Sequence, residues 1–251
     1  RPLQVIHFVP AGDVDQGYRS LPASIEDILG PLIKSGRAAF GVVLKGYIER
    51  LQQPGYVVPD ASTVEYAERI VNRVTDLRRG LDYLETRKDV DASQVAFYGP
   101  SAGAQIGLIL AAVETRYRAV VLLGAGLGPA QARRMAHANP INFAAHIRPP
   151  KLLVQGRYDE DTPLKTQTEP LFRLLPEPKR LFVYEGGHVA PPEVSINTVG
   201  GWLDEILEKA TAREAAHRYE SMDEVLHALS RDPATVWRRR LLVAGAVAAA
   251  G

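Results

Sequence analysis

One serine of this sequence stands in a setting that suits a nucleophile. The segment Gly99-Pro100-Ser101-Ala102-Gly103 follows an apolar run, Val95 to Tyr98, and opens a predicted helix, Ala102 to Glu114. On such a strand-to-helix turn the serine hydroxyl projects above a sheet, and small neighbours let the strand and helix backbones approach closely. Taken alone, the same pattern also fits an ordinary strand-to-helix turn.

An aspartate follows a second predicted strand. The apolar run Lys151 to Val154 leads to Gly156, and Asp159 comes three residues after that glycine. Ligand chemistry in a parallel sheet gathers at the carboxyl ends of the strands, where this aspartate would lie. Asp161 competes for the same role, and it also fits a cap for the helix that begins near Pro163.

A histidine follows a third predicted strand. His188 comes after the run Arg180 to Tyr184 and a Gly186-Gly187 pair that allows the backbone to turn sharply. The other histidines lack this setting; they are His7, His137, His146, His217 and His227. His188 is therefore the predicted partner of the serine and the aspartate.

These three residues together predict nucleophilic catalysis. Ser101, Asp159 and His188 each follow a strand, so a parallel sheet would gather them at one edge. A serine hydroxyl is a poor nucleophile and needs a base within hydrogen-bond reach. We expect His188 to be that base, and later the acid that protonates the leaving group. Asp159 is expected to fix the imidazole tautomer and to stabilise the imidazolium.

The developing oxyanion needs two backbone donors. The N–H of Ala102 is the first expected donor. The second is expected from the loop after the first strand, Pro10-Ala11-Gly12-Asp13, with the N–H of Asp13 as the donor. Gly12 allows a close approach there and is a predicted substrate-binding residue, as is Tyr47. No cofactor and no metal ion are expected.

The hydrophobic pattern predicts an α/β fold, with a mostly parallel sheet and helices on both faces. Short apolar runs without polar interruption are typical of strands buried on both faces. The predicted strands are Val5 to Val9, Ala38 to Leu44, Val95 to Tyr98, Ala119 to Leu123, Lys151 to Val154 and Arg180 to Tyr184. Besides the helix after Ser101, the predicted helices are Pro22 to Ser35, Ser62 to Arg87 and Ile196 to Leu207. The less regular stretch Gly124 to His146 is expected to form a cap or an active-site loop.

The composition narrows the function classes. The chain has 251 residues, 46% of them hydrophobic, which is enough for a substantial core. Its formal net charge of +1 gives no reason to propose a nucleic-acid partner. The absence of cysteine excludes disulfides, thiolate catalysis and cysteine-type zinc sites.

A change in composition after Leu207 predicts two parts, residues 1–207 as the catalytic domain and residues 208–251 as a helical appendage. Glu208 to Asp232 is polar and helical in pattern, and three arginines precede an apolar end, Leu241 to Gly251. Eleven residues are too few for a membrane helix, which needs about 20. The end therefore fits either a frayed terminus or the opening of a truncated transmembrane helix. The expected location is cytoplasmic, with weak membrane contact in the second case, and a homo-oligomer is a further expectation.

The sequence resembles the prolyl-oligopeptidase and dienelactone-hydrolase branch of the α/β-hydrolases, and more narrowly the hydrolase domains fused to bacterial serine/threonine kinases. The matching segments are 34–38, 45–50, 82–87 and 184–189 with Pro191-Pro192. The resemblance covers residues 2 to about 207. It implies a carboxylesterase that acts on a small-molecule ester through an acyl-enzyme, without a cofactor.

Two departures from that family pattern are visible. Relatives usually carry a bulky aromatic residue where this chain has Ala102, which should widen the acyl pocket. The opening strands of the full fold are also missing, so the sheet is expected to begin at its third strand. One sheet edge would then be exposed unless another segment covers it.

The C-terminal part carries a second, shorter resemblance. Segments 209–212, 217–219, 221–223 and 225–229 look like the last helices of a protein-kinase C-lobe. The glycine-rich loop and the catalytic motifs of a kinase are absent, so kinase activity is excluded.

Three functions remain open from the sequence. The first is a serine esterase. The second is a prolyl-oligopeptidase-like peptidase, which shares the fold and the three catalytic residues. The third is a non-catalytic sensing or docking module of a kinase system, in which those residues would be relics.

Overall fold

The computed structural model describes residues 2–16, 18–50, 57–207 and 241–242. The strands are β1 (Leu3–Phe8), β2 (Ala38–Gly41), β3 (Val90–Pro100), β4 (Tyr117–Leu123), β5 (Lys151–Gly156), β6 (Lys179–Tyr184) and β7 (Leu241–Leu242). The α-helices are α1 (Gly12–Asp15), α2 (Leu21–Lys34), α3 (Val64–Glu85), α4 (Ala102–Val113), α5 (Pro129–Ala132), α6 (Ile141–Ala144), α7 (Glu169–Leu174) and α8 (Gly201–Leu207). Short 3-10 helices are η1 (Ile48–Arg50) and η2 (Ala136–Ala138), and π-helices are η3 (Leu164–Thr168) and η4 (Val194–Gly200).

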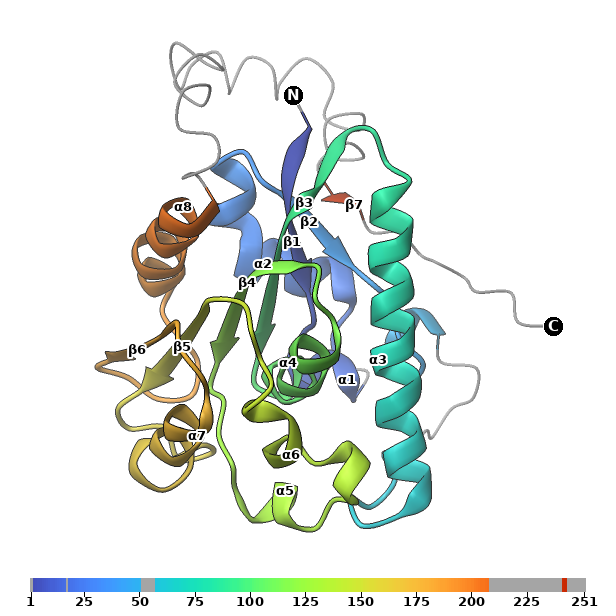
Figure 1. Ribbon diagram of the computed structural model, residues 1–251, viewed down its shortest axis with the longest axis vertical. Helices are drawn as coiled ribbons and strands as arrows, with labels where there is room; N and C mark the ends of the chain where they lie inside the picture. Colours follow the sequence, from blue (N-terminus) through green and yellow to red (C-terminus); the bar gives the residue numbers. More distant parts are fainter. Residues whose placement is uncertain (1, 17, 51–56, 208–240, 243–251) are drawn as a thin grey trace, which may run out of the picture.

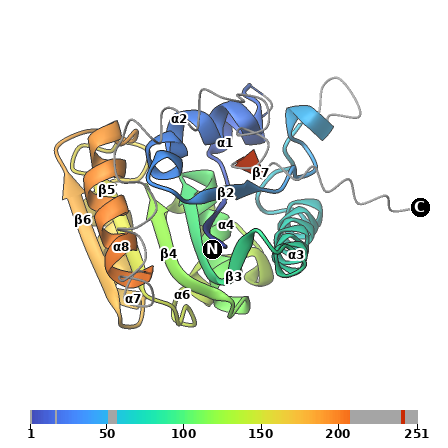
Figure 2. The same ribbon diagram turned by 90° about the horizontal axis from the view of Figure 1, so that it is seen from above.

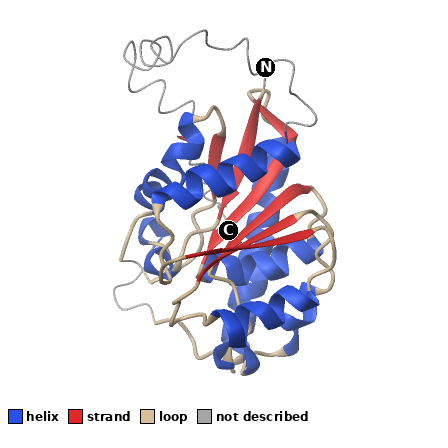
Figure 3. Ribbon diagram, turned by 90° about the vertical axis from the view of Figure 1, so that its left-hand side faces the viewer, coloured by secondary structure: helices blue, strands red, loops and turns tan. Residues whose placement is uncertain are grey.

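The strands form one parallel sheet in the order β6-β5-β4-β3-β1-β2-β7. Helices cover both of its faces, as Figures 1 and 3 show. Helices α3 and α4 pack on one face, and α2, η4 and α8 pack together on the other (Figure 2). The predicted fold class is confirmed.

The strands are all parallel, but the direction in which successive strands are added to the sheet reverses after β2. From β1 the chain runs outward to β2, then crosses back to β3 and continues through β4 and β5 to β6. The loops that follow β1 and β3 therefore leave the sheet in opposite directions, and open α/β sheets bind ligands at such a switch point. Ser101 follows β3, and the loop that opens α1 follows β1, so both lie at this point.

Local sequence signals explain where the long helices begin. Helix α2 begins after Ser20, whose hydroxyl accepts a hydrogen bond from the backbone N–H of Ala23. Helix α3 begins after Thr63, which caps the N–H of Tyr66 in the same way. A capping hydroxyl satisfies one of the N–H groups that have no partner within the helix.

Two sequence expectations need correction or completion. The strand expected over Ala38 to Leu44 ends at Gly41, although Val42, Val43 and Leu44 are buried. Burial without ladder hydrogen bonds explains the error, because an apolar run reports burial rather than pairing. The irregular stretch Gly124 to His146 contains three short helices, α5, η2 and α6.

The outer edge of β2 has a neighbour. Leu241 and Leu242 form β7, which pairs with Ala39 and Phe40 in parallel. The sheet edge that the sequence leaves open is thus partly covered by two residues of the C-terminal part. The helix expected over Glu208 to Asp232 lies outside the described residues, and the domain division at residue 207 stays a prediction. Within the described part of the chain, no helix has the length and hydrophobicity needed to cross a bilayer.

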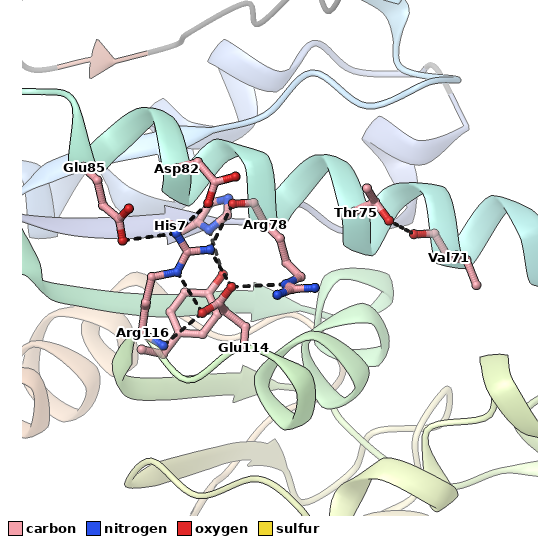
Figure 4. A network of polar contacts seen from close by, with 9 residues as sticks. His7, Val71, Thr75, Arg78, Asp82, Glu85, Glu114 and Arg116 are labelled. Atoms are coloured by element: carbon pink, nitrogen blue, oxygen red, sulfur yellow. Dashed lines mark hydrogen bonds and ion pairs between the residues drawn. The ribbon is translucent and has the colours of Figure 1, made fainter.

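A charged network ties α3, α4 and β4 together (Figure 4). Glu114, which directly follows α4, is only 3% exposed, and Arg116 Nε and Nη2 donate to its two carboxylate oxygens at 2.8 and 2.6 Å. Arg116 also contacts Asp82 and Glu85 on α3, at 2.7 and 3.2 Å. Burial raises the pKa of Glu114, but the hydrogen bonds from Arg116 lower the pKa by more, so its net value is about 2.

Glu114→Gln is expected to lower the free energy of unfolding by about 2 kcal/mol at neutral pH, because it removes the charge from buried hydrogen bonds to arginine. The folded-state pKa of Glu114 lies below its ordinary value of 4.5, so its contribution is complete above about pH 4.5 and is lost as the pH falls towards 2. Urea unfolding of the two proteins at pH 7 and pH 3 measures this.

The matched control is Glu85→Gln, which removes an exposed carboxylate from the same arginine. It should change the free energy of unfolding by less than about 1 kcal/mol. A Glu114→Gln deficit that is equal at both pH values would contradict the assignment.

Candidate active site

Ser101 occupies a strained turn between β3 and α4. Its backbone φ of 49° is the only positive φ among the described residues other than glycine. Its N–H donates to the carbonyl of Leu123 at the end of β4, at 2.8 Å. Such a conformation costs about 1–3 kcal/mol and persists only where the surroundings enforce it.

Glycines on both sides of Ser101 allow this turn. A Cβ atom on Gly103 would lie 2.0 Å from the carbonyl oxygen of Val9, and one on Gly99 would lie 2.7 Å from the backbone of Gly103. The first turn of α4 therefore packs directly against the backbone that follows β1. This contact places Ser101 beside the loop Pro10-Ala11-Gly12-Asp13.

The structure brings Ser101, His188 and Asp159 into one hydrogen-bonded series. His188 Nε2 lies 2.9 Å from Ser101 Oγ, and His188 Nδ1 lies 2.8 Å from Asp159 Oδ2. The side chain of Asp159 is fully buried, whereas that of His188 is 23% exposed. A buried carboxylate on one ring nitrogen holds the proton there and leaves the other nitrogen free to accept from the serine.

Two further donors hold the Asp159 carboxylate. The N–H of Thr162 donates to Oδ1 at 2.8 Å, and the side-chain amide of Gln155 donates to Oδ2 at 2.8 Å. Neither residue is predicted as part of the site from the sequence. The only sequence signal for Gln155 is a polar amide that directly follows the apolar residues Leu152 to Val154.

Asp161 does not share this position. Its carboxylate is exposed, and the residue that precedes η3 is Pro163, so Asp161 is not the helix cap that the sequence allowed. Ligand atoms of Asp159, Asp161 and His188 lie within 4.8 Å of one another, a spacing that a metal ion would fit. The three donors on Asp159 already occupy both of its oxygens, so the arrangement suits a hydrogen-bonded series better than a metal site.

The turn that carries His188 is fixed from three sides. The Tyr184 hydroxyl donates to the carbonyl of Gly187 at 2.6 Å. Burial, and then the charge of Asp159, raise the pKa of Tyr184 to about 12, so its hydroxyl keeps its proton at neutral pH. A Cβ on Gly156 would lie 2.0 Å from the Gly187 carbonyl oxygen, and one on Gly124 would lie 2.9 Å from His188 Cε1.

The other described histidines have different surroundings. His7 is fully buried in β1, with Nδ1 2.8 Å from the Tyr117 hydroxyl, and burial lowers its pKa to about 3. His137 and His146 lie in η2 and after α6. His217 and His227 lie outside the described residues.

The loop predicted to supply the second oxyanion donor lies close to the strand-to-helix turn that carries Ser101. A Cβ on Gly12 would come within 4.0 Å of the Ala102 Cβ, so the start of α1 faces the start of α4. Asp13 is the second residue of α1, and its carboxylate accepts from the N–H of Val14 at 2.8 Å. The oxyanion roles of Ala102 and Asp13 and the substrate contact of Gly12 stay predictions.

Ion pairs anchor α1, which is too short to be stable alone. Asp15 accepts from Arg69 at 2.7 Å and pairs with Arg73, both on α3. Burial raises the pKa of Asp15, but the two arginines lower it by more, so its net pKa is below the ordinary value. Tyr47, a predicted substrate-binding residue, is 1% exposed and lies under the Arg73 guanidinium, 5.6 Å from ring centre to carbon. This burial supports a packing role for Tyr47.

Of three comparisons with known proteins, one finds matches. No family model matches the sequence, and no curated protein is similar to it in sequence. Solved structures do match. TT1662 from Thermus thermophilus is 22% identical, with a TM-score of 0.64 over 83% of this chain and 90% of that one.

Two esterases also match, with slightly lower identities and TM-scores. An acetyl xylan esterase from Paenibacillus sp. R4 is 20% identical, with a TM-score of 0.63 over 82% of this chain and 75% of its own. A cold-adapted esterase from an Arctic intertidal metagenomic library is 18% identical, with a TM-score of 0.61 over 82% and 84%. The chain has the α/β-hydrolase fold, as the sequence resemblance implies.

Gly124→Ala is expected to slow modification of Ser101 by diisopropyl fluorophosphate about a hundredfold. A methyl group at position 124, where φ is +60°, would displace the His188 imidazole, and small misplacements of catalytic groups have costs of this size. The rate of covalent modification is followed by mass spectrometry.

Gly201→Ala serves as the control, because a Cβ there meets nothing within 4 Å and the residue is helical, with φ −61°. If both variants react as fast as the unmodified chain, the close contact between Gly124 and His188 does not set the position of the base.

Proposed function

We propose that this chain is a serine hydrolase that cleaves carboxylic esters of small molecules through an acyl-enzyme. The observation that carries the proposal is the continuous series from Ser101 Oγ through His188 to Asp159, with contacts of 2.9 and 2.8 Å. Two of the similar solved structures are esterases by name, which supports the choice of ester over peptide. Residues 1–207 are the proposed catalytic domain.

Acylation begins with proton transfer. His188 Nε2 accepts the proton of Ser101 Oγ as that oxygen attacks the ester carbonyl carbon. The carbonyl electron pair moves to its oxygen, which the N–H groups of Ala102 and Asp13 stabilise. When the tetrahedral intermediate collapses, the carbonyl re-forms, the bond to the alkoxy oxygen breaks, and His188 gives its proton to the departing alcohol.

Deacylation repeats these steps with water. His188 accepts a proton from a water molecule that attacks the acyl carbon, and then returns that proton to Ser101 Oγ as the carboxylic acid leaves. Asp159 stays ionised and stabilises the imidazolium in both halves of the reaction. The net reaction converts an ester and water into an acid and an alcohol.

Ser101→Ala is expected to lower the hydrolysis rate of p-nitrophenyl acetate by about 10⁴-fold or more, because the nucleophile is lost. Ser93→Ala, which changes an exposed serine on the same strand, should keep the full rate. The measurement is release of p-nitrophenol, with circular dichroism to show that both variants are folded. A folded Ser101→Ala protein that keeps more than a tenth of the activity would refute the nucleophile.

Asp159→Asn and Asp161→Asn separate the two neighbouring carboxylates. The amide at position 159 would favour the wrong imidazole tautomer, so kcat should fall by up to about 10⁴-fold. The exposed Asp161 makes no comparable contact with His188, so its variant should stay within a few-fold of the unmodified chain. The larger loss in Asp161→Asn would show that the third member of the series is wrongly assigned.

A further inference from the structure

A buried glutamine lies directly behind the candidate active site. Gln155 is fully buried at the end of β5. Its Nε2 lies 2.8 Å from Asp159 Oδ2 and 2.8 Å from the carbonyl oxygen of Thr162. Both neighbours can only accept hydrogen bonds, since one is a carboxylate and the other a carbonyl. The amide is therefore oriented with its NH₂ group towards Asp159.

The carbonyl oxygen of this amide is unfavourable for the stability of the fold. Gln155 Oε1 is buried and has no hydrogen-bond partner among the described residues. An unsatisfied buried acceptor costs about 1–3 kcal/mol. An aliphatic side chain would avoid this cost, and the three residues before Gln155 in the strand, Leu152, Leu153 and Val154, are apolar. The amide is thus placed here for its donor rather than for stability.

The donor acts on the oxygen that faces the histidine. Asp159 Oδ2 accepts from Gln155 and contacts His188 Nδ1, while Oδ1 accepts from the N–H of Thr162. Because its side chain is fully buried, this carboxylate is shielded from bulk solvent. The number of protein donors on Oδ2 therefore decides how strongly that oxygen attracts the imidazole proton.

We propose that Gln155 is a positioning residue of the active site: its amide holds the Asp159 carboxylate in plane for His188 and limits how tightly that carboxylate holds the imidazolium. This inference rests on the proposed function. The other titratable groups near Asp159 and His188 are Asp161 on the same turn, Tyr184 on β6, and Ser101 between β3 and α4. They are unchanged in the variants below.

The main test compares Gln155→Met with Gln94→Met. Methionine is similar in length to glutamine and has no donor, and Gln94 is a second buried glutamine with an unpartnered Oε1, on β3. For Gln155→Met we expect kcat for p-nitrophenyl acetate to fall about tenfold to a hundredfold, with KM changed less than threefold. We also expect the acidic limb of the kcat/KM profile to move to higher pH, because Oδ2 loses a competing donor and stabilises the imidazolium more strongly.

The pH profile separates positioning from a structural effect. A loss of packing would lower the amount of active protein without moving the acidic limb of the kcat/KM profile. Gln94→Met should leave both the rate and the pH profile unchanged. A folded Gln155→Met protein with kcat and pH profile within twofold of the unmodified chain would overturn the proposal. An equal change in Gln94→Met would overturn it as well.

A second measurement needs neither a variant nor activity. In ¹⁵N NMR spectra of the unmodified protein, the Gln155 side-chain NH₂ resonances should shift with the same midpoint pH as the His188 ring, because both groups share Asp159 Oδ2. Resonances that do not respond to His188 titration would refute the contact. If the chain cleaves no ester, the proposed function fails, and this titration still decides on Gln155.

Discussion

The close contact between the start of α4 and the backbone after β1 is the constraint on which the rest of the site depends. Gly103 has no room for a side chain, because a Cβ would lie 2.0 Å from the Val9 carbonyl oxygen. The contact forces the chain to turn within one residue, and Ser101 takes the positive φ that results. It also brings the start of α1 close to the start of α4. The proposed nucleophile and the proposed oxyanion donors thus lie on either side of a single packing contact.

A similar contact positions Asp159 and His188, the proposed acid and base. Gly156 at the end of β5 packs against the Gly187 carbonyl after β6, which brings the turns that carry Asp159 and His188 together. The Asp159 carboxylate then joins the two turns, because Oδ1 accepts from Thr162 and Oδ2 contacts both Gln155 and His188. Backbone packing thus sets the position of the two turns, and hydrogen bonds to the buried Asp159 carboxylate set the orientation of the side chains.

Much of the fold and part of the site could be predicted from the sequence, because they depend on local patterns. Apolar runs followed by glycine revealed the strand ends, and Ser101, Asp159 and His188 are each found just after such an end. Contacts between distant segments could not be predicted in this way. Asp15 meets Arg69 across 54 positions, and neither residue type nor spacing indicates the pair. Gln155 follows an apolar run of its strand, and only its distance to Asp159 points to the role proposed for it.

The central claim is that Ser101 is an activated nucleophile that forms an acyl-enzyme. Mixing the protein with excess p-nitrophenyl acetate, quenching with acid after milliseconds to seconds, and mapping the acetyl group by peptide mass spectrometry tests it most directly. We predict an acetyl group on the peptide that contains Ser101, formed together with a burst of one p-nitrophenol per chain. Acetylation confined to lysine or tyrosine side chains, or turnover without any acylated Ser101, would contradict the account.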